Sequence, residues 1–200
     1  YVNKEAFRTL RDDWGVNVIR LAMYPREYNG YLSGGNQTEL KNLIDKGVQY
    51  ATELGMYVII DWHVLNFNPN EIKSEAMTFF DEMSAKYCNY NNVIYEICNE
   101  PVGASWSDKI RPYANDVVAI IRKHDSDAII LVGTNTWSQD VDEVVGNRLD
   151  NDSNVMYVSH FYAATHREEI RRKIRVALNA GVPVFVSECS ICDASGNGGI

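Results

Sequence analysis

The arrangement of apolar runs constrains the fold of this chain more than any other feature. Six short runs rich in Val, Ile and Tyr alternate with longer segments in which apolar residues recur every three or four positions. Successive runs lie roughly 30 residues apart, the length of a strand with its crossover helix. Nearly continuous hydrophobicity is typical of parallel strands covered by helices. The predicted strands are 16–22, 56–62, 93–98, 128–132, 155–161 and 183–187.

The segments between these runs predict helices. A further helix is expected at 3–14, closed by Gly15, with no strand in front of it. Gly55 and Gly181 stand where the C-terminal glycine of a helix is expected. The remaining predicted helices are 36–54, 71–87, 106–124 and 166–180.

The same alternation selects among α/β architectures. The sequence has no Gly-x-Gly-x-x-Gly loop, which disfavours an open sheet that binds nucleotides. Polar residues converging from the ends of many strands favour a barrel. We therefore expect a partial (β/α)8 TIM barrel over residues 1–200, a single domain with strands 2 to 7 present and strands 1 and 8 missing.

Charge and composition limit the partners. The net charge of −8 and the isoelectric point near 5.0 argue against nucleic acid and anionic membrane, because an acidic surface repels polyphosphate. No apolar stretch approaches the roughly 20 residues needed to cross a bilayer. A neutral ligand fits this chain better.

The cysteines give little support for a metal or redox site. Cys189-x-x-Cys192 has the spacing of half a zinc site, but the sequence has no second pair of ligands with similar spacing. Cys98, inside a predicted strand, is expected to be a small buried apolar residue. We expect no metal and no cofactor. A metal-dependent barrel hydrolase would also need a His-x-His strand, and none is present.

Two glutamates follow apolar runs in the same way. Asn99-Glu100-Pro101 ends the third run, where a proline cannot continue the hydrogen-bond ladder, and Glu188 follows the sixth. Both carboxyl groups are therefore expected at the carboxyl edge of the sheet, where α/β enzymes place their chemistry. Two such glutamates indicate acid/base and nucleophilic action on one bond.

Other polar residues occur near the same edge. Residues two apart on a strand share a face, so Asp61 is expected beside His63, and His160 beside Tyr162. A buried charge needs a partner, and Arg20 is the candidate cation for Asp61, Glu96 or Glu188. His124 and His166 are interpreted as surface residues. Trp62 is at least as readily interpreted as a core residue as it is as a platform for a sugar ring.

Six segments, in order along the chain, resemble glycoside hydrolase family 5, in particular bacterial endo-β-1,4-glucanases (cellulases). The resemblance implies a (β/α)8 barrel that hydrolyses β-linked glucans with retention. One departure is Cys189-Ser190, where the family usually has an aromatic residue followed by glycine. The segments are VIRLAMY (18–24), IDWH (60–63), IYEICNEP (94–101), GTNTWSQD (133–140), HFYA (160–163) and FVSE (185–188).

By motif position, the resemblance implies that Glu100 is the acid/base and Glu188 the nucleophile. A retaining mechanism needs these carboxyl groups about 5 Å apart, with one protonated and one ionised. Arg20 and the Tyr162 hydroxyl are expected to keep Glu188 ionised. Asn99 is expected to reach the 2-hydroxyl of the sugar. The residues implied to support the transition state and the nucleophile are Arg20, His63, Asn99, His160 and Tyr162.

The resemblance also suggests how substrate is held. Trp137 and Tyr24 offer flat faces for pyranose rings, and Gln139 lies just after Trp137. Ala194 belongs to the loop 193–199, which in the family borders the non-reducing side of the cleft. The implied partner is a β-linked polysaccharide, and the enzyme is expected to be secreted, extracellular and monomeric in full-length form.

The first interpretation is thus an endo-acting, retaining β-1,4-glucanase. A β-mannanase or a mixed-linkage glucanase on the same framework stays open, as does an inactive carbohydrate-binding fragment. Because only six of eight barrel strands are expected, the first and last strands are predicted to expose unpaired edges. We expect residues 1–200 to be an excerpt of a longer enzyme that is insoluble or inactive alone.

Overall fold

The computed structural model describes residues 2–195 and 197–199. Within them, six parallel strands form one sheet in the order β1-β2-β3-β4-β5-β7, and a second, two-stranded parallel sheet pairs β6 with β8. All six expected strands are present in chain order, which confirms the fold class. The strands are β1 (Val18–Met23), β2 (Tyr57–Trp62), β3 (Val93–Glu96), β4 (Ile129–Gly133), β5 (Val155–Val158), β6 (Phe161–Tyr162), β7 (Val184–Phe185) and β8 (Cys189–Ser190).

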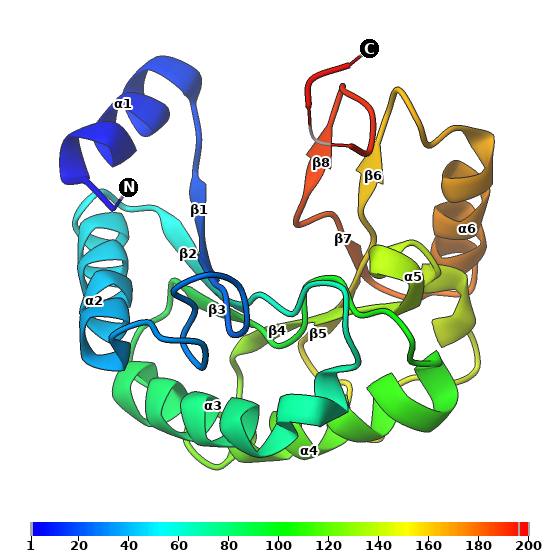
Figure 1. Cartoon of the computed structure of the whole chain (residues 1–200), viewed down its shortest axis with the longest axis horizontal. Coiled ribbons are helices and arrows are strands. Elements are labelled where there is room, and N and C mark those ends of the chain that lie inside the picture. The colour runs from blue at the N-terminus through cyan, green and yellow to red at the C-terminus, as the bar shows by residue number, and fades with distance from the viewer. Residues whose placement is uncertain (1, 196, 200) are drawn as a thin grey trace.

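The sheet curves into an arc with helices along its outer side (Figure 1). The five long helices match the expected segments to within a few residues, apart from the separate turns that precede two of them. The α-helices are α1 (Lys4–Trp14), α2 (Gln37–Glu53), α3 (Lys73–Tyr87), α4 (Arg111–Arg122), α5 (Asn135–Ser138) and α6 (Glu168–Asn179). Short turns are η1 (Pro69–Ile72) and η3 (Val141–Val144), both 3-10, and the π-helical η2 (Trp106–Ile110).

Local sequence explains how α1 begins and ends. The Asn3 side chain accepts from the backbone N–H groups of Glu5 and Ala6, which satisfies two donors at the start of the helix. Gly15 follows the last turn with φ 69°, a left-handed conformation that glycine adopts at little cost. In the part of the chain that the structure describes, no helix is both long and apolar enough to cross a membrane.

The two faces of the sheet have different cores. Alternate residues turn toward the helices and form the main core, whereas Ile59, Ile94, Leu131 and Val158 form a small apolar layer on the inner face. Side chains two apart on a strand share a face, so Asp61, two positions after Ile59, and Glu96, two positions after Ile94, lie directly above that layer. The inner face therefore changes from apolar to charged toward the carboxyl ends of the strands.

Strands β3 and β4 approach each other closely where β4 ends. A Cβ on Gly133 would lie 2.1 Å from the Cys98 carbonyl oxygen and 2.7 Å from that of Asn99, so only glycine fits there. The Gly133 amide instead donates to the Cys98 carbonyl at 2.9 Å. This contact holds the segment after β3 against the sheet, just before Glu100.

Three predicted strand boundaries are wrong. The run 93–98 is a strand only to Glu96, and the run 183–187 only over β7. The run 155–161 is two strands, because the chain leaves the sheet at Ser159 and the His160 amide donates to the Ser138 carbonyl at 2.8 Å. These departures lie at the carboxyl edge of the sheet, where the chain leaves the strand pairing and its side chains contribute to the candidate site.

The ends of the six-stranded sheet are β1 and β7, as predicted. Figure 1 shows β1 and the β7/β8 region on opposite sides of the open arc. Val186, just beyond β7, is 40% exposed.

Candidate active site

Arg20 is the centre of the charged layer. Its guanidinium lies 3.0 Å from Asp61, 2.7 Å from Glu96 and 3.2 Å from Glu188, and its side chain is 16% exposed. The sequence offered these three carboxylates as alternative partners, and the structure brings all three to the one cation. Burial lowers the pKa of Arg20, but the carboxylates outweigh this effect and raise it overall.

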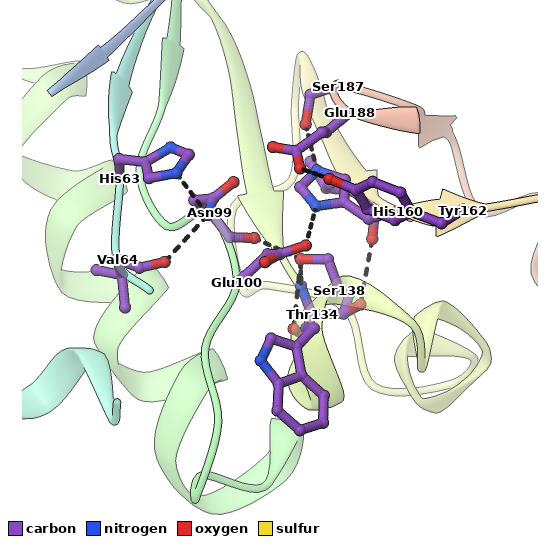
Figure 2. Close-up of polar contacts among 12 residues, drawn as sticks. His63, Val64, Asn99, Glu100, Thr134, Ser138, His160, Tyr162, Ser187 and Glu188 are labelled. Carbon is purple, nitrogen blue, oxygen red and sulfur yellow. Dashed lines mark hydrogen bonds and ion pairs between the residues drawn. The ribbon is translucent and has the colours of Figure 1, made fainter. Parts of the chain in front are cut away.

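Glu188 has a donor on each carboxyl oxygen. The Tyr162 hydroxyl donates to Oε1 at 2.5 Å (Figure 2). Arg20 Nη1 donates to Oε2 at 3.2 Å. Burial raises the pKa of Glu188, but the Tyr162 hydrogen bond and the charge of Arg20 are among the effects that outweigh it and hold the pKa below its ordinary value. The carboxyl group of Glu188 is therefore held in its ionised form at neutral pH.

Glu100 is placed opposite Glu188. Its amide donates to the Val64 carbonyl at 2.9 Å, and its Oε1 lies 2.9 Å from Nδ1 of the buried His160. One oxygen of Glu100, one of Glu188 and a ring nitrogen of His160 all lie within 4.8 Å of one another. Two carboxyl groups this close can act on one bond as proton donor and nucleophile.

A second buried network of hydrogen bonds contacts the Arg20 guanidinium. His63 Nδ1 lies 2.6 Å from Asp61 Oδ2, as strand parity predicted. Asn99 Oδ1 accepts from Arg20 at 2.6 Å, while its amide nitrogen donates to the Val64 carbonyl at 3.2 Å and lies 3.3 Å from His63 Nε2. These contacts fix the side chains of His63 and Asn99 around the guanidinium.

Trp137 is displayed by a turn of left-handed backbone. Thr136, Trp137 and Ser138 have φ values of 54°, 55° and 57°, although none is glycine. Such residues cost about 1 to 3 kcal/mol each and persist where surrounding contacts fix them. Here the Ser138 hydroxyl donates to the Asn99 carbonyl at 2.6 Å, and the Trp137 indole N–H donates to Asn66 Oδ1 at 2.6 Å. The half-exposed indole is thus held rigidly beside Glu100.

A cleft of about 490 Å³ lies between Trp137 and Glu100. Gln139 and Ala194 line it as expected, but Tyr24 does not. Its lining residues are Leu65, Asn66, Glu100, Trp137, Gln139, His160, Tyr162, His166 and Ala194.

Tyr24 lies instead in a larger hollow of about 600 Å³ beside β1. That hollow is lined chiefly by apolar side chains and does not include Glu100, which lines the smaller cleft, so the smaller cleft is the better candidate for chemistry. The ring of Tyr24 stands 4.1 Å from that of His63, which places Tyr24 beside the charged layer on its other side. Within the loop 193–199, Gly196 lies outside the described residues.

Residues 1–199 match the family "Cellulase (glycosyl hydrolase family 5)". The chain belongs to glycosyl hydrolase family 5.

Curated relatives include endoglucanase A of Butyrivibrio fibrisolvens and an endoglucanase of Clostridium saccharobutylicum. Each is 53% identical over the whole of this chain, which covers 47% of the first and 44% of the second. The chain thus spans about half the length of the curated relatives it matches.

Solved family 5 structures agree with the fold. The cellulase Cel5C_n superimposes with a TM-score of 0.95 at 42% identity, over 100% of this chain and 63% of that one. A variant of the catalytic domain of Thermobifida fusca endoglucanase Cel5A, in complex with cellotetraose, gives a TM-score of 0.90 at 36% identity, over 98% of this chain and 65% of that one.

Glu100, His160 and Glu188 also carry the chemical groups of a metal site, with ligand atoms within 4.8 Å. In this structure each of these groups has a hydrogen-bonding partner. His160 and Glu100 contact each other, and Glu188 accepts from Tyr162 and Arg20. The four cysteines are free thiols, with Cys98 buried as expected and Cys189 exposed.

One assignment from the sequence is wrong, and two are confirmed. His166 is partly buried and lines the cleft, because the Tyr162 amide donates to its Nδ1 at 2.9 Å. His124 lies at the surface against Asp81. Trp62 is fully buried against Phe79, so it packs in the core.

Three residues that hydrogen-bond to this candidate site were not among the residues expected from the sequence. Asn66 holds the Trp137 indole, Ser138 holds the left-handed turn, and Ser187 lies between His160 and Glu96. Ser187 alone had an available signal: it directly precedes Glu188 at the end of the sixth apolar run.

Proposed function

We propose that the protein carrying this chain is a secreted, monomeric endo-β-1,4-glucanase that acts with retention of configuration. The observation that carries the proposal is the carboxyl pair. Oxygens of Glu100 and Glu188 lie within 4.8 Å, and Glu188 is held ionised by Tyr162 and Arg20. The separation fits double displacement, since inverting enzymes keep their carboxyl groups about 6.5 to 9.5 Å apart.

In the first step, Glu188 attacks the anomeric carbon while Glu100 protonates the departing glycosidic oxygen, leaving a covalent glycosyl ester on Glu188. In the second step, Glu100 takes a proton from water, the water oxygen attacks the same carbon, and the ester bond breaks. Asn99 is assigned to the sugar 2-hydroxyl. Arg20, His63, His160 and Tyr162 position the reacting groups without forming bonds to substrate carbon.

Four residues are assigned to substrate binding. Trp137 offers a rigid aromatic face on the leaving-group side, and Gln139 and Ala194 line the same cleft. Tyr24 is assigned to the glycone side, because it stands against His63 beyond the charged layer. The endoglucanase names of the relatives and the cellotetraose bound to a family member support a β-1,4-glucan as substrate.

The test is an assay of the natural full-length protein on carboxymethyl cellulose, glucomannan and mixed-linkage β-glucan, with NMR of the first anomer released. We expect carboxymethyl cellulose to be cleaved and the β-anomer to appear first. Preference for glucomannan would indicate a mannanase, and preference for mixed-linkage glucan the corresponding glucanase. Release of the α-anomer would contradict retention.

Glu188→Gln tests the nucleophile. The substitution keeps the shape of the side chain but removes its negative charge, so turnover is expected to disappear while binding of cellotetraose stays nearly unchanged. Glu143→Gln, at an exposed glutamate on η3, is the matched control and is expected to retain activity. Near-normal turnover by Glu188→Gln would remove the assignment.

A further inference from the structure

A hydrogen-bonded chain runs from Glu100 into the buried charged layer. Glu100 Oε1 lies 2.9 Å from His160 Nδ1, His160 Nε2 lies 2.8 Å from the Ser187 hydroxyl, and that hydroxyl donates to Glu96 Oε1 at 2.6 Å. Figure 2 shows Ser187 and Glu100 on opposite sides of the His160 ring.

We propose that Ser187 is a positioning residue that fixes the tautomer of His160 and thereby holds the acid proton on the line between His160 and Glu100. The proposal rests on the proposed function, in which Glu100 delivers that proton to the leaving group.

Glu96 sets the direction of the first hydrogen bond. Arg20 donates to both of its oxygens, from Nε to Oε2 at 2.7 Å and from Nη2 to Oε1 at 3.1 Å. A carboxyl group that meets a guanidinium on both oxygens is the ionised form, which can only accept. Ser187 has one hydroxyl proton, and the 2.6 Å contact assigns it to Glu96.

The Ser187 oxygen therefore offers only lone pairs to His160. Because a lone pair on Nε2 would face these lone pairs at 2.8 Å, Nε2 must carry a hydrogen. Nδ1 then faces Glu100 Oε1, and the one further proton of the pair lies in the 2.9 Å contact between them. The anion buried at Glu96 thus determines, through two hydrogen bonds, where the proton beside the cleft is held.

This arrangement suits both steps of the proposed reaction. In the first step the O–H bond of Glu100 breaks as the proton moves to the glycosidic oxygen, and Glu100 becomes a carboxylate. That carboxylate faces the lone pair of Nδ1 on a neutral imidazole whose hydrogen is fixed on the far nitrogen, so the two groups repel each other. Glu100 is then a better acceptor for the proton of the incoming water.

Without the Ser187 hydroxyl, the tautomer of His160 is no longer fixed. Nε2–H loses its acceptor, and the ring hydrogen can move to Nδ1, where it donates to ionised Glu100 and favours loss of the acid proton. The other titratable groups near His160 are Glu188, just beyond β7, and Tyr162 of β6, whose neutral hydroxyl donates to Glu188. Both are unchanged by the substitution, so their effects cancel in a comparison.

The chain offers close controls. Ser159, next to His160, is fully buried, and its hydroxyl has no partner among residues 2–195 and 197–199. Ser159→Ala therefore removes a buried hydroxyl nearby without touching the network. At position 187, threonine and valine have side chains of nearly the same shape. Ser187→Thr keeps the hydroxyl, whereas Ser187→Val has a methyl group in its place.

Two substrates separate proton donation from general damage. Cellotetraose has a poor leaving group that needs a proton, whereas 2,4-dinitrophenyl β-cellobioside has a good leaving group that departs without one. In the full-length protein, Ser187→Ala and Ser187→Val are expected to lower kcat/KM on cellotetraose about tenfold, or about 1.4 kcal/mol. Their kcat/KM on the dinitrophenyl substrate is expected to stay within about twofold.

For these two variants, the basic limb of the pH profile on cellotetraose is also expected to move to lower pH. Ser187→Thr and Ser159→Ala are expected to resemble the unsubstituted protein. An equal loss on both substrates, an unmoved basic limb, or the same effect from Ser159→Ala would overturn the proposal.

A measurement without substrate tests the tautomer directly. Long-range 1H–15N NMR of 15N-histidine-labelled protein, with His160 assigned from its absence in His160→Gln, is expected to show Nε2–H. Nδ1–H at His160 would overturn the proposal even in an active enzyme. If the unsubstituted protein failed to cleave β-glucan, the proposed function would fail while Nε2–H still supported the tautomer.

Discussion

Replacing Arg20 with methionine removes the cation at the centre of the site while keeping a side chain of similar length. Asp61 and Glu96, both fully buried, would then face each other without a counter-ion. Removing one partner of a buried ion pair costs about 3 to 5 kcal/mol, because the remaining charge stays uncompensated. Since domains unfold with a total of about 5 to 15 kcal/mol, Arg20→Met is expected to remove a large share of the stability.

The effect should depend on pH in a defined direction. Burial raises the pKa of Glu96, and Arg20 opposes that shift. Without Arg20 the folded-state pKa rises further above the unfolded value of about 4.3, so the folded variant takes up a proton that the unfolded chain does not. The resulting stability is present at low pH and is lost as pH rises. The destabilisation is therefore expected to be smaller at pH 5 than at pH 8. The difference is about 1.4 kcal/mol for each pH unit between 5 and 8 over which the folded variant holds this proton and the unfolded chain does not.

Urea unfolding of the full-length protein at pH 5, 7 and 8, followed by tryptophan fluorescence and circular dichroism, measures this effect. Arg8→Met is the matched control, because Arg8 forms an exposed ion pair with Glu5 at 3.0 Å, a kind of pair worth about 0 to 1 kcal/mol. A loss below about 1 kcal/mol for Arg20→Met, or a loss independent of pH, would refute the reasoning. It would show that the buried carboxylates are compensated without the guanidinium.

Two further predictions concern the cleft and Glu188. Trp137→Ala removes the rigid indole face and is expected to raise KM for cellotetraose about tenfold with kcat little changed, as measured by steady-state kinetics; an unchanged KM would mean that the indole does not bind sugar. Tyr162→Phe removes the hydroxyl that lowers the pKa of Glu188, so the acid limb of kcat/KM is expected to move to higher pH. A stationary acid limb would show that Glu188 does not control it.

The order of the strands could be predicted from the sequence because each strand is a short apolar run between amphipathic segments. The end of the fifth run could not. Its break at Ser159 depends on the hydrogen bond from the His160 amide to the Ser138 carbonyl, and that carbonyl is placed by the left-handed turn at 136–138. Threonine and tryptophan are unfavourable in that conformation, so local propensity points away from it. The turn exists because tertiary contacts fix it.

The candidate site divides in the same way. Glu100, Glu188 and Arg20 follow from strand ends and from the need to pair buried charge. Ser187 and Asn66 do not, because their partners, Glu96 and Trp137, are 91 and 71 positions away in the chain. A serine or an asparagine at a loop or strand end fits many surroundings, and its partner is set only when the strands are assembled.

The link between Arg20 and Glu188 has a consequence for how the protein folds. These residues are 168 positions apart, one in the first strand of the arc and one just beyond the last. Contacts between such distant parts of a chain form late, because closing a long loop costs entropy before any contact compensates for it. During synthesis, Glu188 leaves the ribosome only after all six strands of the sheet have been made. A nascent or half-folded chain therefore lacks the paired carboxyl groups, and the proposed hydrolytic activity is expected only after β1 and the segment beyond β7 have come together.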